Sequence, residues 1–369
     1  MTDIDIRKLL DELIETTTEE TFNINEVPHT LLLNLNKWHW GSYGWISPAS
    51  LIFTATWRKY LFPNEDCCKI WALDENHNPI EGGYSIRSCD EQITIPILAK
   101  HDLCTGYCSP NSGMQGSRAI EKMRSLKRLN TDFEKSQKTV FDLKLFATIL
   151  NQIDCLDSEQ ALKTLQYQII IAKRIRSERI KTNEVLQHGN SASFNLLDFL
   201  SKTADPELTK CVVAACFDVI YSNSGLILDG VSDYKTAADA RAKKPGDLSL
   251  RKDHNTLIAI EVKDKTQTID WNNIDRAKKI IKANPNLINF IFVLEKRDAT
   301  VTDTIQEMIR SPQFQSEPCR IITFISVHDL FLLALSSCNE ITIINRTSYY
   351  LSLAPAVKPE TKKAWLQET

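Results

Sequence analysis

Three short apolar runs alternate with helical patterns in the second half of the chain, and this alternation constrains the fold more than any other feature. The runs are LIAIEVK at 257–263, LINFIFVL at 287–294 and CRIITFIS at 319–326. Their length and composition predict buried strands. The segments at 270–284, 301–311 and 327–338 have the pattern of helices, and Asp270 is a suitable N-cap. The alternation predicts an α/β architecture, with helices packed on a mixed sheet.

The segments before these runs extend the prediction. An apolar helix is expected at 206–222, and short strands are expected at 225–231 and 247–251. Helices are expected at 3–20, 48–61 and through most of 119–181, with an aromatic loop at 38–48. Turn signals across 63–118 indicate short strands and long loops. We therefore expect a mainly helical, loop-rich region over 1–181, a mixed α/β core over 182–353 and a polar C-terminal tail over 354–369.

Charge and hydropathy exclude several classes of protein. The chain has 44 Lys and Arg against 47 Asp and Glu, which gives a net charge of −3. A nucleic-acid site must therefore be a local basic patch. The sequence has no apolar run long enough for a membrane span, and its charged start, MTDIDIRKLLDELIE, does not resemble a secretory signal. We expect a cytoplasmic protein without a membrane partner.

The 10 cysteines admit two interpretations. Cys104 and Cys108 form a C-x3-C pair near His101, but a zinc site needs further ligands at a fitting distance. Reduced loop or core thiols are the favoured interpretation. Those expected among apolar residues are Cys155, Cys211, Cys216 and Cys319.

The segment at 245–263, PGDLSLRKDHNTLIAIEVK, carries the candidate chemistry. Residues two apart on a strand share a face, so Glu261 and Lys263 project together while Val262 points into the core. A short hairpin brings Asp247 beside them. Two carboxylates are suitable ligands for Mg²⁺, which activates water and neutralises phosphate charge. The lysine can orient that water, either as a charged partner or as a base. This set suits phosphodiester hydrolysis.

The pattern [DE]-x-K is weak by itself, because it occurs four times in the chain. Only Glu261 and Lys263 end an apolar strand pattern with a Gly-Asp pair one hairpin upstream. Burying both charges without a purpose is costly. The structural alternative is an ion pair at the end of a strand.

This stretch resembles the PD-(D/E)xK nuclease core, and more of the chain is similar to the SacI-type restriction endonucleases. The similar segments include 84–97, 106–118, 210–222 and 245–271. The resemblance implies that Asp247 and Glu261 bind Mg²⁺ and that Lys263 serves the water. The sequence has P-G-D where the family pattern has P-D. Many members use a further acid on the preceding helix, for which Asp218 is a candidate.

The resemblance also implies an activity and partners. It implies a type II restriction endonuclease that cleaves double-stranded DNA at a short palindromic site and leaves 5′-phosphates. A homodimer is expected, because a two-fold protein reads a two-fold site. A prokaryotic host with a cognate DNA methyltransferase, in a restriction-modification system, is expected as well.

Candidate DNA contacts follow from side-chain chemistry. Arg pairs with guanine, and Asn or Gln pairs with adenine, in the major groove, whereas cations near the site bind phosphates. Basic runs occur at 118–128, 173–181 and 241–252, and their alternative interpretation is a solvated helix face. The residues that we expect to bind DNA are Arg87, Asn111, Gln115, Arg118, Lys243, Lys244 and Arg251.

Three other functions remain open from the sequence. A repair or recombination nuclease of the same fold is one, although the chain has no phosphate-binding loop of the G-x-x-x-x-G-K-[ST] type. A non-catalytic DNA-binding module is another. An α/β enzyme of unrelated chemistry is the last.

Overall fold

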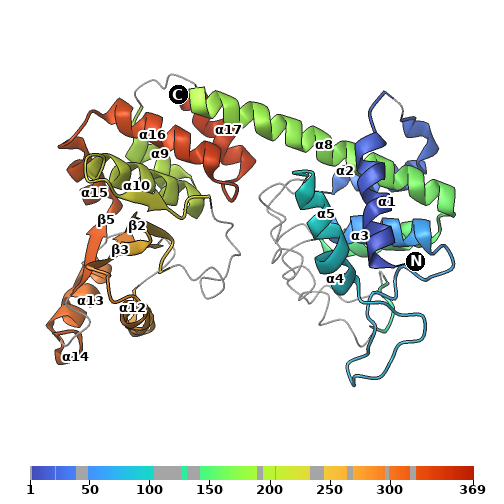
Figure 1. The fold of residues 1–369 in the computed structure, drawn as a ribbon, viewed down its shortest axis with the longest axis horizontal. Coiled ribbons are helices and arrows are strands. Elements are labelled where there is room, and N and C mark those ends of the chain that lie inside the picture. Colours follow the sequence, from blue (N-terminus) through green and yellow to red (C-terminus); the bar gives the residue numbers. More distant parts are fainter. Residues whose placement is uncertain are drawn as a thin grey trace. The chain divides into compact units, whose positions relative to one another are not determined.

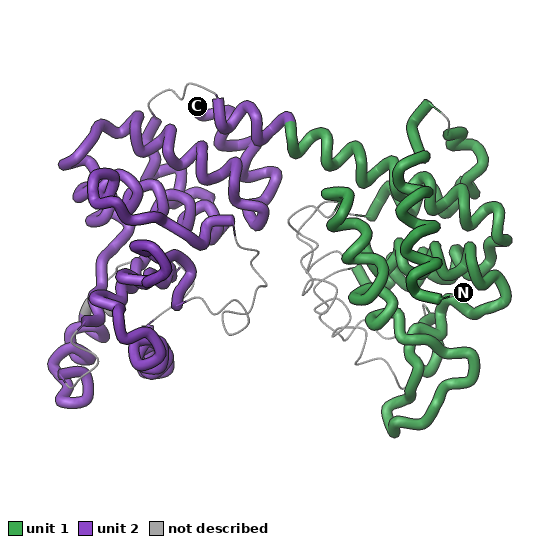
Figure 2. Tube along the Cα trace, in the orientation of Figure 1, with its two compact units in different colours: residues 1–180 green, residues 181–369 purple. Residues whose placement is uncertain are grey.

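The computed structural model describes residues 2–20, 22–38, 49–103, 126–130, 142–188, 194–203, 205–232, 245–263, 269–295, 299–315 and 321–369. The chain divides into two compact units, residues 1–180 and 181–369, which are called unit 1 and unit 2 below (Figure 2). The second unit includes the segment 354–369. No helix in the described ranges is both long and apolar enough to cross a membrane.

Unit 1 is mainly helical in its described parts, and the described stretch 62–85 consists of turns and loops (Figure 1). The longer helices are α1 (Asp3–Thr16), α2 (His29–Lys37), α3 (Ala49–Leu61), α7 (Leu143–Asp154) and α8 (Ser158–His188), and α8 continues into unit 2. The short elements are a 3₁₀ turn η1 (Ile24–Glu26), α4 (Ile86–Cys89), a π-helical segment η2 (Asp90–Thr94) and α5 (Ile95–Lys100). The expected helix at 48–61 is confirmed.

The segment 84–97 corrects the expectation of short strands in this region. It is helical from Ile86 through α4, η2 and α5. Ser85 begins it as an N-cap that accepts a hydrogen bond from Ser88 N. The apolar side chains of Ile86, Ile93 and Ile97 are buried. The β-branched residues of this segment favour strands, but tertiary burial of one helical face outweighs that preference.

Unit 2 is built on a five-stranded sheet in the order β1-β2-β3-β4-β5. The strands are β1 (Ile227–Asp229), β2 (Leu248–Lys252), β3 (Asn255–Lys263), β4 (Asn289–Leu294) and β5 (Ile322–Ser326). The first three pair antiparallel, and β3, β4 and β5 pair parallel. The helices are α9 (Leu196–Lys202), α10 (Pro206–Ile220), α12 (Trp271–Ala283), α13 (Ala299–Arg310), α14 (Pro312–Gln315), α15 (Val327–Leu335), α16 (Glu340–Leu353) and α17 (Pro359–Glu368). The predicted α/β fold, a mixed sheet flanked by helices, is confirmed.

The two faces of the sheet have different helical layers. Ile258 and Ile260 of β3 pack into a core with α10, α15 and α16. Ala259, between them, packs with α12 and α13 on the other face. Because side chains alternate along a strand, Glu261 and Lys263 lie on the α12 face and Val262 lies on the α10 face. The sheet therefore presents the two charged residues at the end of β3, next to α12.

The expectation of a polar tail at 354–369 is wrong. Pro359 begins α17, and Trp365 is fully buried against Phe194 and Phe199 in edge-on contacts. Asp205, the N-cap of α10, accepts hydrogen bonds from Lys358 N and Thr361 Oγ1 at 3.0 and 2.8 Å. The segment is polar in most of its residues, but the large apolar side chain of Trp365 packs α17 onto the rest of unit 2.

Candidate active site

Asp247 lies directly before β2, where the backbone approaches the neighbouring segments closely. Leu248 pairs with Ile260, which sets Asp247 beside Glu261 at the end of β3. A Cβ at Gly246 would lie 2.7 Å from Ile260 O, and one at Gly230 would lie 2.4 Å from Asp247 O. Side chains at both positions would therefore push the strands apart. Because position 246 has no room for a side chain, glycine is needed there, which accounts for P-G-D in this chain.

The Asp247 carboxylate is oriented by the neighbouring strand. Its Oδ2 accepts a hydrogen bond of 2.9 Å from Val262 N. Its other oxygen makes no hydrogen bond to the residues that the structure describes. One oxygen is thus held by the β3 backbone while the other is available at the end of the sheet.

Glu261 and Lys263 form a buried pair on the same face of β3. Their side chains lie 3.1 Å apart between Nζ and Oε1, and the residues are 6% and 8% exposed. Burial and, to a smaller extent, the negative charge of Asp247 raise the pKa of Glu261 to about 7, although the Lys263 ammonium opposes both. Two carboxylates close together in a partly dry site repel each other, so this arrangement favours a bound cation. The sequence-predicted trio is brought together.

Helix α12 adds a cation that the sequence did not single out. Arg276 NH1 lies 3.6 Å from Glu261 Oε1, and its side chain is about half exposed. Helix α10 adds a second cation, because the charge of Lys210 lowers the pKa of Glu261. Lys210 is 4.0 Å from Glu207 in the same turn. The sequence signal for Lys210 is that it and Glu207 are charged residues in the first turn of a helix that is otherwise largely apolar.

Asp218 does not belong to this group of residues. Its Oδ2 lies 3.4 Å from Arg346 Nε on α16. Asp218 and Lys210 are eight residues apart on α10, which is about 12 Å along a helix axis. The upstream acid in the first turn of α10 is Glu207, and Asp218 links two helices.

The sequence-predicted DNA contacts divide into two groups. Arg87 on α4 is paired with Glu91 at 2.9 Å, and Arg251 on β2 is paired with Asp229 at 3.0 Å. Arg251 also lines a polar pocket of about 300 Å³ at the hairpin end of the sheet. Those outside the described residues are Asn111, Gln115, Arg118, Lys243 and Lys244.

The described residues do not test the zinc interpretation of the C-x3-C pair. His101 contacts Asp11 at 2.6 Å, and Cys104 and Cys108 lie outside the described residues, as does Cys319. Cys211 and Cys216 are buried as expected, and burial raises the pKa of both thiols. Cys155 is exposed, because it follows the last turn of α7. The expectation of a buried Cys155 is therefore wrong.

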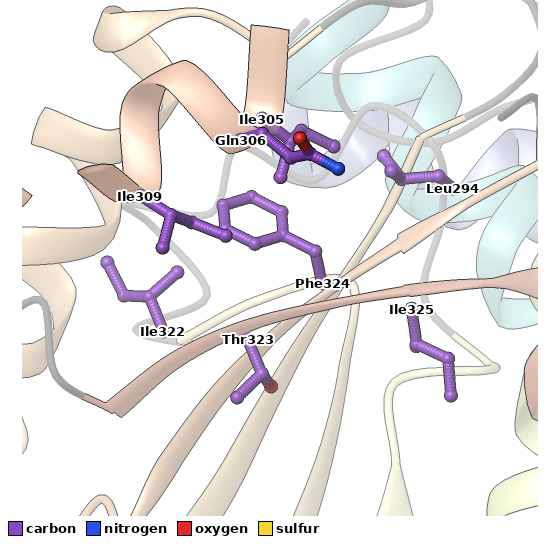
Figure 3. A pocket seen from close by; sticks show the side chains of 8 residues that line it. All are labelled: Leu294, Ile305, Gln306, Ile309, Ile322, Thr323, Phe324 and Ile325. Carbon is purple, nitrogen blue, oxygen red and sulfur yellow. The ribbon is translucent and has the colours of Figure 1, made fainter. Parts of the chain in front are cut away.

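An apolar pocket of about 300 Å³ lies between β5 and α13 (Figure 3). Phe324 stands in it and stacks on Phe292 with ring centroids 5.5 Å apart. Its lining offers only Gln306 and Thr323 as polar side chains. Hydrolytic chemistry has no suitable groups there, so the end of β3 remains the candidate active site.

Comparison with known proteins places a family on the same region. Residues 182–293 match the sequence model of the SacI restriction endonuclease C-terminal domain. None of the curated proteins compared with the chain matches it. The matched span contains Asp247, Glu261 and Lys263, together with the helices α10 and α12 that flank them. Over this span, the chain is similar to the SacI-type restriction endonucleases, and the match supports a nuclease of that kind.

Proposed function

We propose that the chain is a Mg²⁺-dependent type II restriction endonuclease, which hydrolyses double-stranded DNA at a short palindromic site and leaves 5′-phosphates. The observation that carries the proposal is the position of the buried Glu261–Lys263 pair, 3.1 Å apart and beside Asp247, within the matched domain. The PD-(D/E)xK assignment of these three residues is part of this proposal.

The donor set fits a magnesium ion. Asp247 and Glu261 would hold it, since both offer hard carboxylate oxygens, and burial together with their mutual repulsion raises the pKa of Glu261. When bound, the ion supplies charge neutralisation at the scissile phosphate and a water of lowered pKa.

The residues of the chain have separate roles in this proposal. The backbone of Val262 orients the Asp247 carboxylate, and Lys263 Nζ is held by Glu261 Oε1. Lys263 would orient the attacking water and stabilise the negative charge that develops on phosphate oxygens. Burial of the pair limits competing water and strengthens these interactions.

The proposal extends to partners and surroundings. A homodimer would match a palindromic site, and the helical unit 1 would supply DNA recognition and dimerisation. We place the protein in a prokaryotic cytoplasm, where a cognate DNA methyltransferase would protect the host sequence.

A digest of phage DNA tests the proposal. Discrete fragments are expected with Mg²⁺, and none are expected with EDTA or with Lys263→Ala, which should lower the rate by about 10²-fold or more. Lys363→Ala, an exposed lysine of α17, is the matched control and should cut normally. A smear would instead favour a repair or recombination nuclease. Binding without cleavage would favour a non-catalytic module, and normal cleavage by Lys263→Ala would reject the assigned role.

A further inference from the structure

Helix α12 has one apolar face and one cationic face. Its buried residues are Ile274, Ala277 and Ile281, which pack on the sheet. Its exposed side includes Arg276, Lys279 and Lys282. The buried face accounts for the fold, but it does not require three cations on the opposite side, where uncharged polar residues would serve equally well.

Two of these cations, Lys279 and Lys282, are poorly compensated. The single acid of the helix, Asp275, lies 3.5 Å from Lys278, which also stands over the ring of Trp271 at 5.9 Å. Lys279 and Lys282 have no ion pair within the ranges that the structure describes. In a chain whose net charge is −3, this face is a local positive surface. Such a surface attracts a polyanion.

The cationic face begins at the candidate active site. Arg276 reaches Glu261 Oε1 at 3.6 Å, whereas Lys279 and Lys282 follow at intervals of three residues toward the other end of the helix. A helix rises 1.5 Å per residue, so Arg276 and Lys282 are separated by about 9 Å along the axis. Successive phosphates of one DNA strand are about 3.4 Å apart along the duplex axis. The three side chains thus span two to three phosphate steps.

We propose that the exposed face of α12 binds the phosphate backbone of duplex DNA beside the scissile bond. Arg276 contacts the phosphate nearest the site, and Lys279 and Lys282 contact phosphates farther along the same strand. These contacts fix the register of the duplex on the site and carry no sequence information. The inference rests on the proposed nuclease function and adds a binding surface to it.

The salt dependence of DNA binding tests this surface. Affinity for a labelled duplex of about 30 base pairs and random sequence is measured in EDTA, between about 50 and 200 mM salt. Each lost phosphate contact lowers the slope of log K against log[salt] by about 0.9. The slope of the double variant Lys279→Ala/Lys282→Ala should be smaller by about 1.8. The ratio of wild-type affinity to variant affinity should therefore fall about 12-fold over this salt range. The charge-matched control is Lys278→Ala/Lys363→Ala, which should keep the wild-type slope.

Each outcome separates the surface from the chemistry. A reduced slope in the first double variant alone, with an unchanged melting temperature, supports the proposal. Equal slopes in the two double variants would overturn it, while Mg²⁺-dependent cleavage by wild type would leave the nuclease function intact. If wild type neither binds nor cuts DNA, the nuclease function fails and the α12 surface fails with it.

Discussion

The hydroxyl of Thr209, in the first turn of α10, donates a hydrogen bond of 2.7 Å to Glu295 Oε2 just beyond the end of β4. Glu295 N in turn donates to Lys263 O at 2.9 Å. Glu295 therefore connects α10 to the strand that carries the candidate lysine. The contact joins two layers of unit 2 at the end of the sheet where the candidate site lies.

Replacing Thr209 by Val should weaken this connection. The substitution keeps the shape of a buried side chain and removes the hydroxyl donor from Glu295. We expect unit 2 to lose about 1–3 kcal/mol of stability, measured by urea unfolding. Thr209→Ser keeps the hydroxyl and is the control, and it should lose less than the valine variant. A valine variant that loses no more stability than the serine variant would contradict the role given to the hydroxyl.

Glu261→Gln should stabilise the protein and abolish cleavage together. The pKa of Glu261 lies at about 7, above its ordinary value of 4.5, so the folded protein keeps a proton that the unfolded chain has released. The contribution of this group to stability is therefore greatest below about pH 4.5 and falls as pH rises toward 7. At pH 8, the amide should raise stability by on the order of 1–3 kcal/mol.

Calorimetry at pH 5 and pH 8, with and without Mg²⁺, measures this effect. Wild type should melt higher when Mg²⁺ is added at pH 8, because an ion that binds the folded state stabilises it. Glu261→Gln should lose this shift. A variant that still responds to Mg²⁺ as wild type does would exclude Glu261 as a ligand.

Asp90 provides a matched acid outside the candidate site. It is fully buried in unit 1, and burial raises its pKa to about 7 although Ser50 and Thr54 donate hydrogen bonds to its carboxylate. Its contribution to stability also declines between about pH 4 and 7. Asp90→Asn should weaken that decline while cleavage and the Mg²⁺ shift stay at wild-type levels. Loss of cleavage in this variant, without loss of folding, would contradict the separation of the two buried acids.

Gly246→Ala should impair both folding and cleavage. The new Cβ would lie 2.7 Å from Ile260 O, which belongs to the strand that also carries Glu261. We expect a loss of about 1–3 kcal/mol and a slower cleavage rate, because overpacking moves the backbone that positions Asp247. Gly225→Ala is the control, since its Cβ meets nothing within 4 Å and its cost comes from a φ of +71°. Cleavage by that variant should be normal at a temperature where it is folded.

The substitution Trp365→Ala should lower the stability of unit 2. Trp365 packs edge-on against Phe194 and Phe199, and its Nε1 donates to Ser348 Oγ at 2.9 Å. Removal of a buried tryptophan typically costs about 3–5 kcal/mol. Trp365→Phe keeps the aromatic packing and should cost less. If the two variants unfold at the same denaturant concentration, the loss of stability comes from the missing hydrogen bond to Ser348 and not from the missing ring.

The sequence was sufficient for the parts of unit 2 whose patterns are local. Glu261 and Lys263 are two residues apart on one strand, and Asp247 is joined to them by a single hairpin, so pleat alternation alone predicts their convergence. Asp270 was recognised as an N-cap, and it caps α12 in a capping box with Asn273. Such signals need no knowledge of distant residues.

The missed residues depend on tertiary packing. Arg276 meets Glu261 because α12 covers that face of the sheet, and Thr209 meets Glu295 across 86 residues of sequence. The type and the helix of Asp218 make it a candidate upstream acid, but the register of α10 turns it toward Arg346. A helix pattern shows which face is apolar without showing which element will cover it.

Because Trp365 is part of its buried core, unit 2 completes that core late in synthesis. The strands and α10 are complete long before residue 365 is made, yet Phe194 and Phe199 lack their edge-on contacts with Trp365 until then. A ribosome adds about 5–20 residues per second, so early segments wait for many seconds beside an incomplete core. Unit 2, which carries the candidate active site, is therefore fully packed only after α17 has emerged.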